Sequence, residues 1–321
     1  MTIVTNTFTR YDAKGIREDL ANVIYNISPE ETPFQSNTAR VNVKNTFFEW
    51  QTDSLAAAST TNAALEGDDI SSFDSVTATS RLGNYTQISR KTVVISGTLE
   101  SVDKAGRRSE LAYQMAKNGA ELKRDCEAIL LASKAANAGN NTTARQTAGL
   151  PAFLRTNTNY GSGGSDPTVS NGVVNATRVD GTQRTFTETI LKDVIAQVWT
   201  QGGTPKILMV GPFNKQTVSG FAGIAEIRYN QATPRPSVII GAADVYVSDF
   251  GAVSVVPNRF QRERDAFVID PDYAKLMTLR PYQQVELAKT GDAEKRMLIV
   301  EWGLKVTAEN AHGIAADLIT S

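Results

Sequence analysis

The stretch GRRSELAYQMAKNGAELKRDCEAILLASKAA, residues 106–136, contains the longest unbroken helical pattern in the sequence. One set of side chains recurs at steps of three or four and therefore lies on one face of a helix: Leu111, Met115, Asn118, Leu122, Cys126 and Ile129. We predict a helix over 107–136, with Ser109 as its N-cap and residues 137–139 as its stop. At 1.5 Å per residue, a helix of about 28 residues would be roughly 42 Å long, which suits a spine across a flat molecule.

The charged residues of this stretch are predicted to lie around the rest of the helix. Lys117 with Glu121, and Lys123 with Glu127, have the spacing of surface ion pairs worth about 0.2–0.5 kcal/mol each. Cys126 falls on the apolar face, where a cysteine usually acts as a small buried hydrophobe. It is the single cysteine of the chain, so a disulfide framework within the chain is excluded.

Length and composition limit the class of protein. The chain has 321 residues, of which 41% are hydrophobic, and this length favours more than one core. The net charge of −1 excludes a global basic field for nucleic acid. The first residues lack the apolar run of a signal peptide, and apolar runs such as Ile207–Val210 are far too short to span a bilayer. We therefore expect a soluble protein made in the cytosol.

The first 95 residues are predicted to form an arm and a projection. Gly15–Ile27 has a short helical pattern that ends at Ser28-Pro29, and such an arm must lie along its own body or a neighbour's. Val41–Gln51 and Val76–Ile95 are strand-like. The segment between them, Leu55–Ser75, is far longer than ordinary hairpin loops of about 2–5 residues. It is predicted to be either disordered or held by another molecule.

The rest of the chain is predicted to alternate between loops, an α/β unit and strands. Residues 137–184 are loop-rich, and residues 185–260 read as a separate α/β unit. In that unit Thr185 and Glu188 have capping-box spacing, Pro212 opens a second helix, and residues 245–256 read as a hairpin. Strands are predicted at 267–269, 282–287 and 297–306, and the last of these should pair near the long helix.

No constellation for catalysis, metal binding or a cofactor is found in the sequence. His312 is the single histidine and is interpreted as structural, and one His with one Cys cannot form the usual zinc sites. Gly211–Lys215 lacks the spacing of a P-loop. The cluster of Arg259, Arg262 and Arg264 is interpreted as a solvated or interface surface. We predict no enzymatic activity, no catalytic residue, no metal and no cofactor.

The order of these parts resembles the Hong Kong 97 (HK-97) fold of tailed-phage major capsid proteins, an α+β fold. The chain is similar to the SU-10-like branch of major head proteins over nearly its whole length. The order of short stretches carries the resemblance: Ser28–Phe34, Phe48–Asp53, Glu66–Asp69, Ser101–Gly106, Glu121–Asp125, Asp249–Gly251, Glu301–Leu304 and Asn310–Ile314.

The resemblance implies a domain plan. It consists of an N-terminal arm (1–41), an extended loop (42–95), a peripheral domain with the spine helix (96–184), an axial domain (185–260) and closing strands of the peripheral domain (261–321). It also implies a capsid protein that self-assembles into pentamers and hexamers, which form an icosahedral or prolate shell around double-stranded DNA. Assembly would occur in the host bacterial cytoplasm, and no membrane is involved.

The implied partners are other copies of the chain, a portal protein, and scaffolding or decoration proteins. Glu66, Asp68 and Asp69 are the predicted assembly residues of the loop, with Arg107 and Arg108 as their partners on another subunit. Two alternatives stay open. One is an encapsulin-type shell around a cargo enzyme, and the other is a cytosolic enzyme with an unusual loop.

Overall fold

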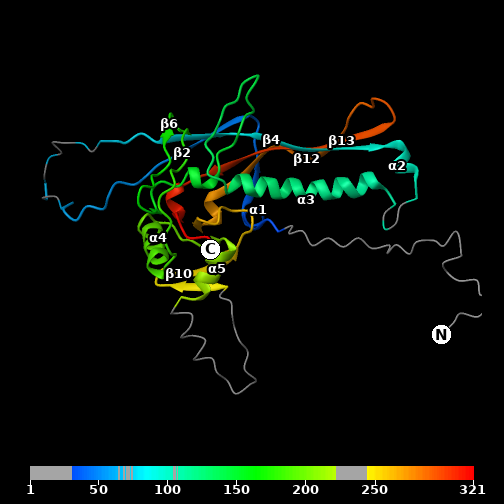
Figure 1. Cartoon of the computed structure of the whole chain (residues 1–321). Coiled ribbons are helices and arrows are strands. Elements are labelled where there is room, and N and C mark those ends of the chain that lie inside the picture. Colours follow the sequence, from blue (N-terminus) through cyan, green and yellow to red (C-terminus); the bar gives the residue numbers. More distant parts are fainter. Residues whose placement is uncertain are drawn as a thin grey trace, which may run out of the picture.

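A computed structural model of the chain describes residues 31–63, 66–67, 69, 73, 75–103, 106, 108–221 and 244–321. Figure 1 shows an elongated molecule in which a long helix lies beneath a long, narrow sheet. An α/β body sits at one end of this rod, and a loop projects beyond the body. The predicted helix at Gly15–Ile27 lies outside the described residues.

The long helix is α3, Glu110–Leu130, and it is shorter than the predicted span of 107–136. Its start was predicted correctly, because the Oγ of Ser109 accepts a hydrogen bond from Ala112 N at 3.2 Å. Its end was not. Beyond Leu130 the backbone bonds to other segments, with Gly149 N donating to the carbonyl of Lys134 at 3.1 Å. These bonds replace the helical ones, so the helix stops before its sequence pattern does.

The apolar face of α3 is confirmed at Leu111, Leu122 and Cys126, which are buried. The prediction for Glu127 is wrong. This residue does not lie on the surface beside Lys123 but is fully buried. Its carboxylate accepts four hydrogen bonds from other segments, which offset the cost of removing it from water.

The sheet above α3 has the strand order β1-β12-β13-β4. Its strands are β1 (Ala39–Asn42), β12 (Ala274–Glu286), β13 (Ala293–Val306) and β4 (Gln87–Ser96). The predicted hairpin at residues 290–292 joins β12 to β13, and β13 pairs along its length with β4. Helix α3 packs against β4 and β13, as predicted for the last strand. The short helices α1 (Pro33–Asn37) and α2 (Gly97–Ser101) precede and follow strands of this sheet.

The body at the end of the rod contains a six-stranded mixed sheet of order β5-β14-β11-β8-β10-β9. Its strands are β5 (Thr158–Asn159), β14 (Gly313–Ala315), β11 (Ala266–Ile269), β8 (Ile207–Val210), β10 (Gly251–Pro257) and β9 (Val245–Ser248). The predicted hairpin is β9–β10. Because β11 and β14 follow residue 260, this sheet combines residues that the predicted domain plan assigns to different domains.

Two helices belong to this body, α4 (Glu188–Thr200) and α5 (Pro212–Ser219). Pro212 opens α5 as predicted. The N-cap of α4 is Thr187, whose Oγ1 accepts from Ile190 N at 3.4 Å, so the predicted capping box from Thr185 is wrong. Phe186 is buried in this body, and the N-cap lies two residues later than the spacing predicted.

A third, four-stranded sheet forms the root of the projecting loop. It has the order β2-β3-β7-β6, with β2 (Phe47–Thr52), β3 (Ser80–Tyr85), β7 (Val173–Val174) and β6 (Val169–Ser170). The predicted single strand Val76–Ile95 is therefore two strands in different sheets. Thr86 separates them and is fully buried, and its N–H donates to the Thr46 carbonyl at 2.8 Å.

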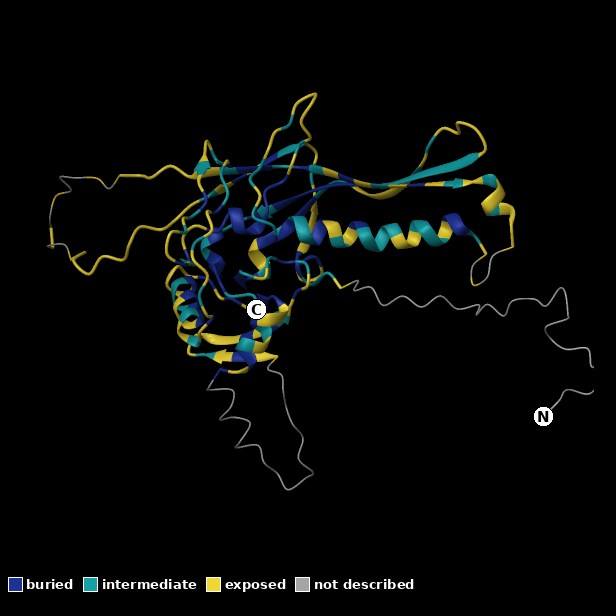
Figure 2. Cartoon of the chain, viewed as in Figure 1, coloured by how far each residue is buried: buried dark blue, intermediate teal, exposed yellow. Residues whose placement is uncertain are grey.

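Two hydrophobic cores lie where these layers meet, as the dark blue regions of Figure 2 indicate. The larger core joins α3, the long sheet and the aromatic side chains of β2, and the smaller lies between α4, α5 and the six-stranded sheet. Three single-turn 3-10 helices complete the described chain: Leu150–Ala152, Pro271–Tyr273 and Glu309–Ala311. In the part of the chain that the structure describes, no helix has the length and apolar character needed to cross a bilayer.

Candidate functional site: a projecting assembly loop

The segment between β2 and β3 is the most exposed part of the described molecule. Its ends are paired at Thr52 and Ser80. Between them the described residues form a turn at Glu66 and Gly67 but no strand. Figure 1 shows this loop extending away from the α/β body, at the opposite end of the molecule from α2. A segment held in this way contributes little to the fold of its own chain.

Among the described residues of this loop, three large apolar side chains are open to solvent. The exposed fractions are 100% for Leu55, 88% for Phe73 and 98% for Val76. Leaving such groups in water forgoes the free energy that burial would release, about 25 cal/mol per Å² of apolar surface. Exposed apolar groups gathered on one projection are typical of a contact surface.

Buried hydrogen bonds attach the root of the loop to the body. Asn84 on β3 is fully buried. Its Nδ2 donates to the Leu304 carbonyl at 2.7 Å and to Thr147 Oγ1 at 3.0 Å, while its Oδ1 accepts from Ala148 N at 3.0 Å. This one amide ties the root to β13 and to the chain beyond α3. Sequence reasoning missed it, because a lone asparagine in a strand carries no distinctive pattern.

A buried carboxylate holds the junction between β3 and β4. Glu301 on β13 is buried and accepts from Arg280 Nε at 2.8 Å and from Thr86 Oγ1 at 2.9 Å. The guanidinium of Arg145 makes a further short contact with the same carboxylate. Two guanidinium groups thus compensate the buried carboxylate at the point where β3 passes into β4.

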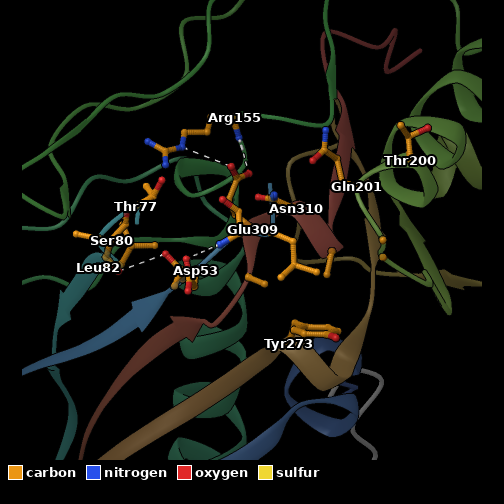
Figure 3. A pocket seen from close by; sticks show the side chains of 18 residues that line it. Asp53, Thr77, Ser80, Leu82, Arg155, Thr200, Gln201, Tyr273, Glu309 and Asn310 are labelled. Carbon is orange, nitrogen blue, oxygen red and sulfur yellow. Dashed lines mark hydrogen bonds and ion pairs between the residues drawn. The ribbon is translucent and has the colours of Figure 1, made fainter. Parts of the chain in front are cut away.

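A hollow of about 510 Å³ lies beside the root of the loop. Figure 3 shows Asp53 and Thr77 of the loop and Ser80 of β3 facing it from one side, with Gln201 and Tyr273 on the other.

The carboxylate of Glu309 in this hollow already accepts hydrogen bonds from its own chain. It accepts hydrogen bonds from the backbone N–H groups of Arg155 and Thr156, both at 3.3 Å, and from both of their side chains. Those bonds fix the position of Glu309, so we interpret it as structural. In the described residues no group of three or more His, Cys, Asp or Glu side chains is arranged to hold a metal ion.

The predicted assembly residues are placed as follows. Glu66 and Asp69 are exposed on the loop, and Arg108 is exposed just before α3. Asp68 and Arg107 lie outside the described residues. Because the loop and the start of α3 lie at opposite ends of the molecule in Figure 1, the structure does not bring these charges together within one chain.

Two of the three arginines predicted to form a solvated or interface surface are half-buried in ion pairs within the chain. Arg264 pairs with Asp317 at 2.6 Å and with Asp180 at 3.2 Å. Arg262 pairs with Asp180 at 2.7 Å, and its Nε lies 3.4 Å from Asp265. Only Arg259 of the three is exposed. These pairs attach the loop-rich segment before α4 to the core. The acidic partners are distant along the chain, so local patterns could not indicate them.

The two residue types that most often carry chemistry are both buried. His312 is fully buried, its Nδ1 accepts from Asp270 N at 3.3 Å, and burial lowers its pKa to about 4. Burial raises the pKa of the Cys126 thiol to about 11, so the thiolate is scarce at neutral pH. Both geometries agree with the structural roles predicted for these residues.

The architecture is that of virus-shell subunits with the HK97 fold. The cyanophage A-1(L) capsid subunit superimposes with a TM-score of 0.70 at 12% identity, covering 94% of this chain and 97% of that chain. The SrpI encapsulin of Synechococcus elongatus superimposes with a TM-score of 0.56 at 10% identity, covering 96% and 94%. At these identities the likeness concerns the fold alone, and it is shared by phage capsids and encapsulins.

Sequence comparison distinguishes a phage capsid protein from an encapsulin. The family model described as SU10 major capsid protein matches residues 3–319. The major capsid protein of Escherichia phage Phieco32 is 30% identical over 343 residues, which cover 96% of each chain. The chain belongs to the SU10 major capsid protein family. It is thus a phage major capsid protein, a structural protein of the virion capsid, and this interpretation fits better than the encapsulin alternative.

Proposed function

We propose that this capsid protein assembles with copies of itself into pentamers and hexamers, whose loops clasp neighbouring subunits. The observation that carries the proposal is the projecting loop, with Leu55, Phe73 and Val76 exposed above a root that buried hydrogen bonds attach to the body. Each such contact is modest, but closure of a shell repeats it at every equivalent interface. The pentamers and hexamers would close an icosahedral or prolate head.

Charge contacts would accompany the apolar ones. Glu66, Asp68 and Asp69 of one subunit are our candidates to meet Arg107 and Arg108 of the next. The opposite placement of the loop and of the start of α3 supports a head-to-tail arrangement of this kind. Exposed ion pairs are worth only about 0–1 kcal/mol each. They would therefore orient neighbouring subunits and add little to the stability of the contact.

The domain plan remains part of the proposal. The arm (1–41), extended loop (42–95), axial domain (185–260) and peripheral domain (96–184 and 261–321) would be the units that meet neighbours. We would add β11 and β14 to the axial unit, because they complete its sheet.

The further partners we propose are a portal protein, scaffolding or decoration proteins, and the enclosed double-stranded DNA. A structural neighbour with a TM-score of 0.51, from phage G, was solved with decoration proteins, which supports that class of partner. The net charge of −1 suits an inner wall that surrounds DNA without binding it tightly. The protein would act without catalysis or cofactor, and assembly would take place in the host bacterial cytoplasm.

The experiment replaces residues 55–75 by a two-residue Asn-Gly turn, which keeps β2 and β3 paired. We expect the isolated subunit to melt within a few degrees of the original chain and shells to be absent or fragile in electron micrographs. Normal shells would contradict the loop's role in assembly. An unfolded subunit would show that the segment belongs to the core.

The second candidate is an encapsulin-like shell, favoured only by the fold shared with SrpI. Nucleic acid and protein content of particles purified from infected cells distinguishes the two. Packaged double-stranded DNA supports the phage head, and an enclosed cargo enzyme without DNA supports the encapsulin.

A further inference from the structure

An open apolar groove runs along the middle of α3. On the helix it is lined by Ala112, Met115, Ala116 and Gly119, and on the sheet by Tyr282 and Leu298. Its volume is about 470 Å³. None of residues 112–121 is buried, and Figure 2 shows this part of α3 in teal and yellow between dark blue ends. The middle of the spine therefore leaves apolar surface uncovered by the described chain.

Gly119 indicates that the groove binds another structural element. Glycine in a helix interior is unfavourable relative to alanine, because it loses more conformational freedom on folding. The fold does not require it here, since an added Cβ would meet only Leu298 Cδ2, at an ordinary 3.8 Å. The glycine leaves the groove open down to the helix backbone, which allows another element to approach closely.

The N-terminal arm is attached beside one end of this groove. Gln35 Nε2 donates to the Lys123 carbonyl at 2.9 Å, and Phe34 N donates to Glu127 Oε1 at 2.7 Å. Lys123 also lines the groove. The first described residue of the arm, Glu31, is three residues before Phe34, and 30 residues precede it in the sequence.

The sequence before Glu31 contains a segment of matching length and character. Residues 16–27 lie outside the described residues, and their pattern predicts an amphipathic helix with apolar side chains at Ile16, Leu20, Val23, Ile24 and Ile27. Twelve helical residues extend about 18 Å, and the groove from Ala112 to Lys123 extends about 17 Å along α3. Residues 28–31 can span about 13 Å, enough to connect the anchored arm to the near end of the groove.

We propose that residues 16–27 of this chain dock into the groove of their own subunit, parallel to α3, with the apolar face against Met115 and Leu298. Ile27 would lie at the Lys123 end of the groove and Ile16 at the Ala112 end. The arm must bury its apolar side on some surface, and this groove is the apolar surface beside its point of attachment. The docking is a property of a single subunit and does not depend on the proposed shell contacts.

Disulfide formation in the full-length chain tests the proposal. In a Cys126→Ala background, Leu20→Cys is combined either with Met115→Cys, inside the groove, or with the matched control Lys117→Cys, which is exposed on another side of α3. After mild oxidation we expect an intrachain disulfide for the Met115 pair at ten times or more the rate of the Lys117 pair. Equal rates, or no disulfide in either, would overturn the docking. An interchain disulfide of the Met115 pair would overturn the same-subunit assignment and identify a second copy as the occupant.

Limited trypsin cleavage gives an independent readout, because Arg17 lies within the docking segment. We expect Arg17 to be cleaved at least tenfold faster in Ala116→Trp, which fills the groove, and at the original rate in Lys117→Trp. Both positions are exposed, and thermal melting checks that each variant is folded. Cleavage at Arg17 at one rate in all three chains would reject the proposal. If Ala116→Trp does not fold, the disulfide experiment alone decides.

Discussion

The backbone N–H of Phe34 donates to Glu127 Oε1 at 2.7 Å, across 93 residues of sequence. Oε2 of the same carboxylate accepts from Gln35 N at 3.1 Å, and Oε1 also accepts from Asn258 Nδ2 at 2.8 Å. One buried side chain of the spine helix therefore joins the arm, the spine and the end of β10. Burial raises the pKa of Glu127, but the donors around it satisfy the charged form.

Glu127→Gln is expected to destabilise the subunit by about 2 kcal/mol. The amide nitrogen of glutamine cannot accept from backbone N–H groups, and hydrogen bonds to a charged acceptor contribute about 1.5–3 kcal/mol. Urea unfolding of the full chain measures the change. Glu121→Gln is the matched control, because Glu121 lies on the same helix, 3.7 Å from Lys91 and partly exposed, and should cost less than about 1 kcal/mol. Equal losses in the two variants would argue against a special role for Glu127.

Leu122→Asp is expected to prevent folding. Leu122 is 1% exposed in the larger core, where an ionised carboxylate without a partner carries a penalty of several kcal/mol. Solubility and circular dichroism of the purified variant report the outcome. Lys123→Asp, at the adjacent exposed position, serves as control and should fold. A soluble, assembly-competent Leu122→Asp protein would show that the buried face of α3 has been misplaced.

Local patterns in the sequence predicted the elements that depend on local forces. The face of α3, its Ser109 cap, strand β8, the start of α5 at Pro212 and the two hairpins all follow from periodicity, capping and turn chemistry. The order of short stretches identified the family and its fold. These features need only neighbours along the chain, so one sequence suffices to find them.

Long-range partners could not be found in this way. The helix pattern continues beyond Leu130, but the backbone there forms hydrogen bonds with residues 146–174 in place of helical ones. No local sequence pattern indicates these distant partners. Glu127 has the spacing of a surface ion pair with Lys123, yet the arm covers it. Arg262 and Arg264 look like a basic surface until Asp180 and Asp317 are placed beside them. In each case a residue distant in sequence determines the environment of the side chain or backbone group.

His312 is expected to make the subunit sensitive to acid. Its pKa in the folded chain is lowered to about 4 by burial, from an ordinary value of 6.5. The unfolded chain therefore binds a proton first as the pH falls, and stability is lost between pH 6.5 and 4. From pH 7 to 5 the loss from this group is about 2 kcal/mol at about 1.4 kcal/mol per pH unit. Denaturant unfolding of His312→Gln, which does not titrate, should lack this part of the pH dependence. Parallel curves for both proteins would show that His312 is not the group involved.

Asp265 is expected to act in the opposite direction. It is fully buried, and desolvation raises its pKa to about 6 from 3.8, despite the attraction of Arg262 and Arg178. The folded chain therefore keeps this proton longer than the unfolded chain, and stability falls as the pH rises from 3.8 to 6. The Asp265→Asn variant should lose more stability than the original chain on acidification from pH 6 to 4, because the contribution of His312 is no longer offset. Unfolding midpoints at the two pH values, compared within each protein, measure this difference. A smaller acid loss in the variant would contradict the raised pKa.

Serine at Leu55, Phe73 and Val76 together is expected to abolish shells and leave the subunit intact. All three side chains are at least 88% exposed, so the folded chain loses few contacts, and surface changes of this kind usually alter stability by no more than about 0.5 kcal/mol. If these groups are buried against a neighbour, each removal costs the interface the transfer free energy of a large apolar side chain, about 1.5–3 kcal/mol. Repeated at every subunit contact, that loss should reduce particle yield at least tenfold in electron micrographs. Serine at Thr60, Thr61 and Asn62 places the same number of new serines in the same loop, and this control should assemble normally. Equal particle yields from the two triple variants would show that the apolar side chains of the loop do not hold the shell together.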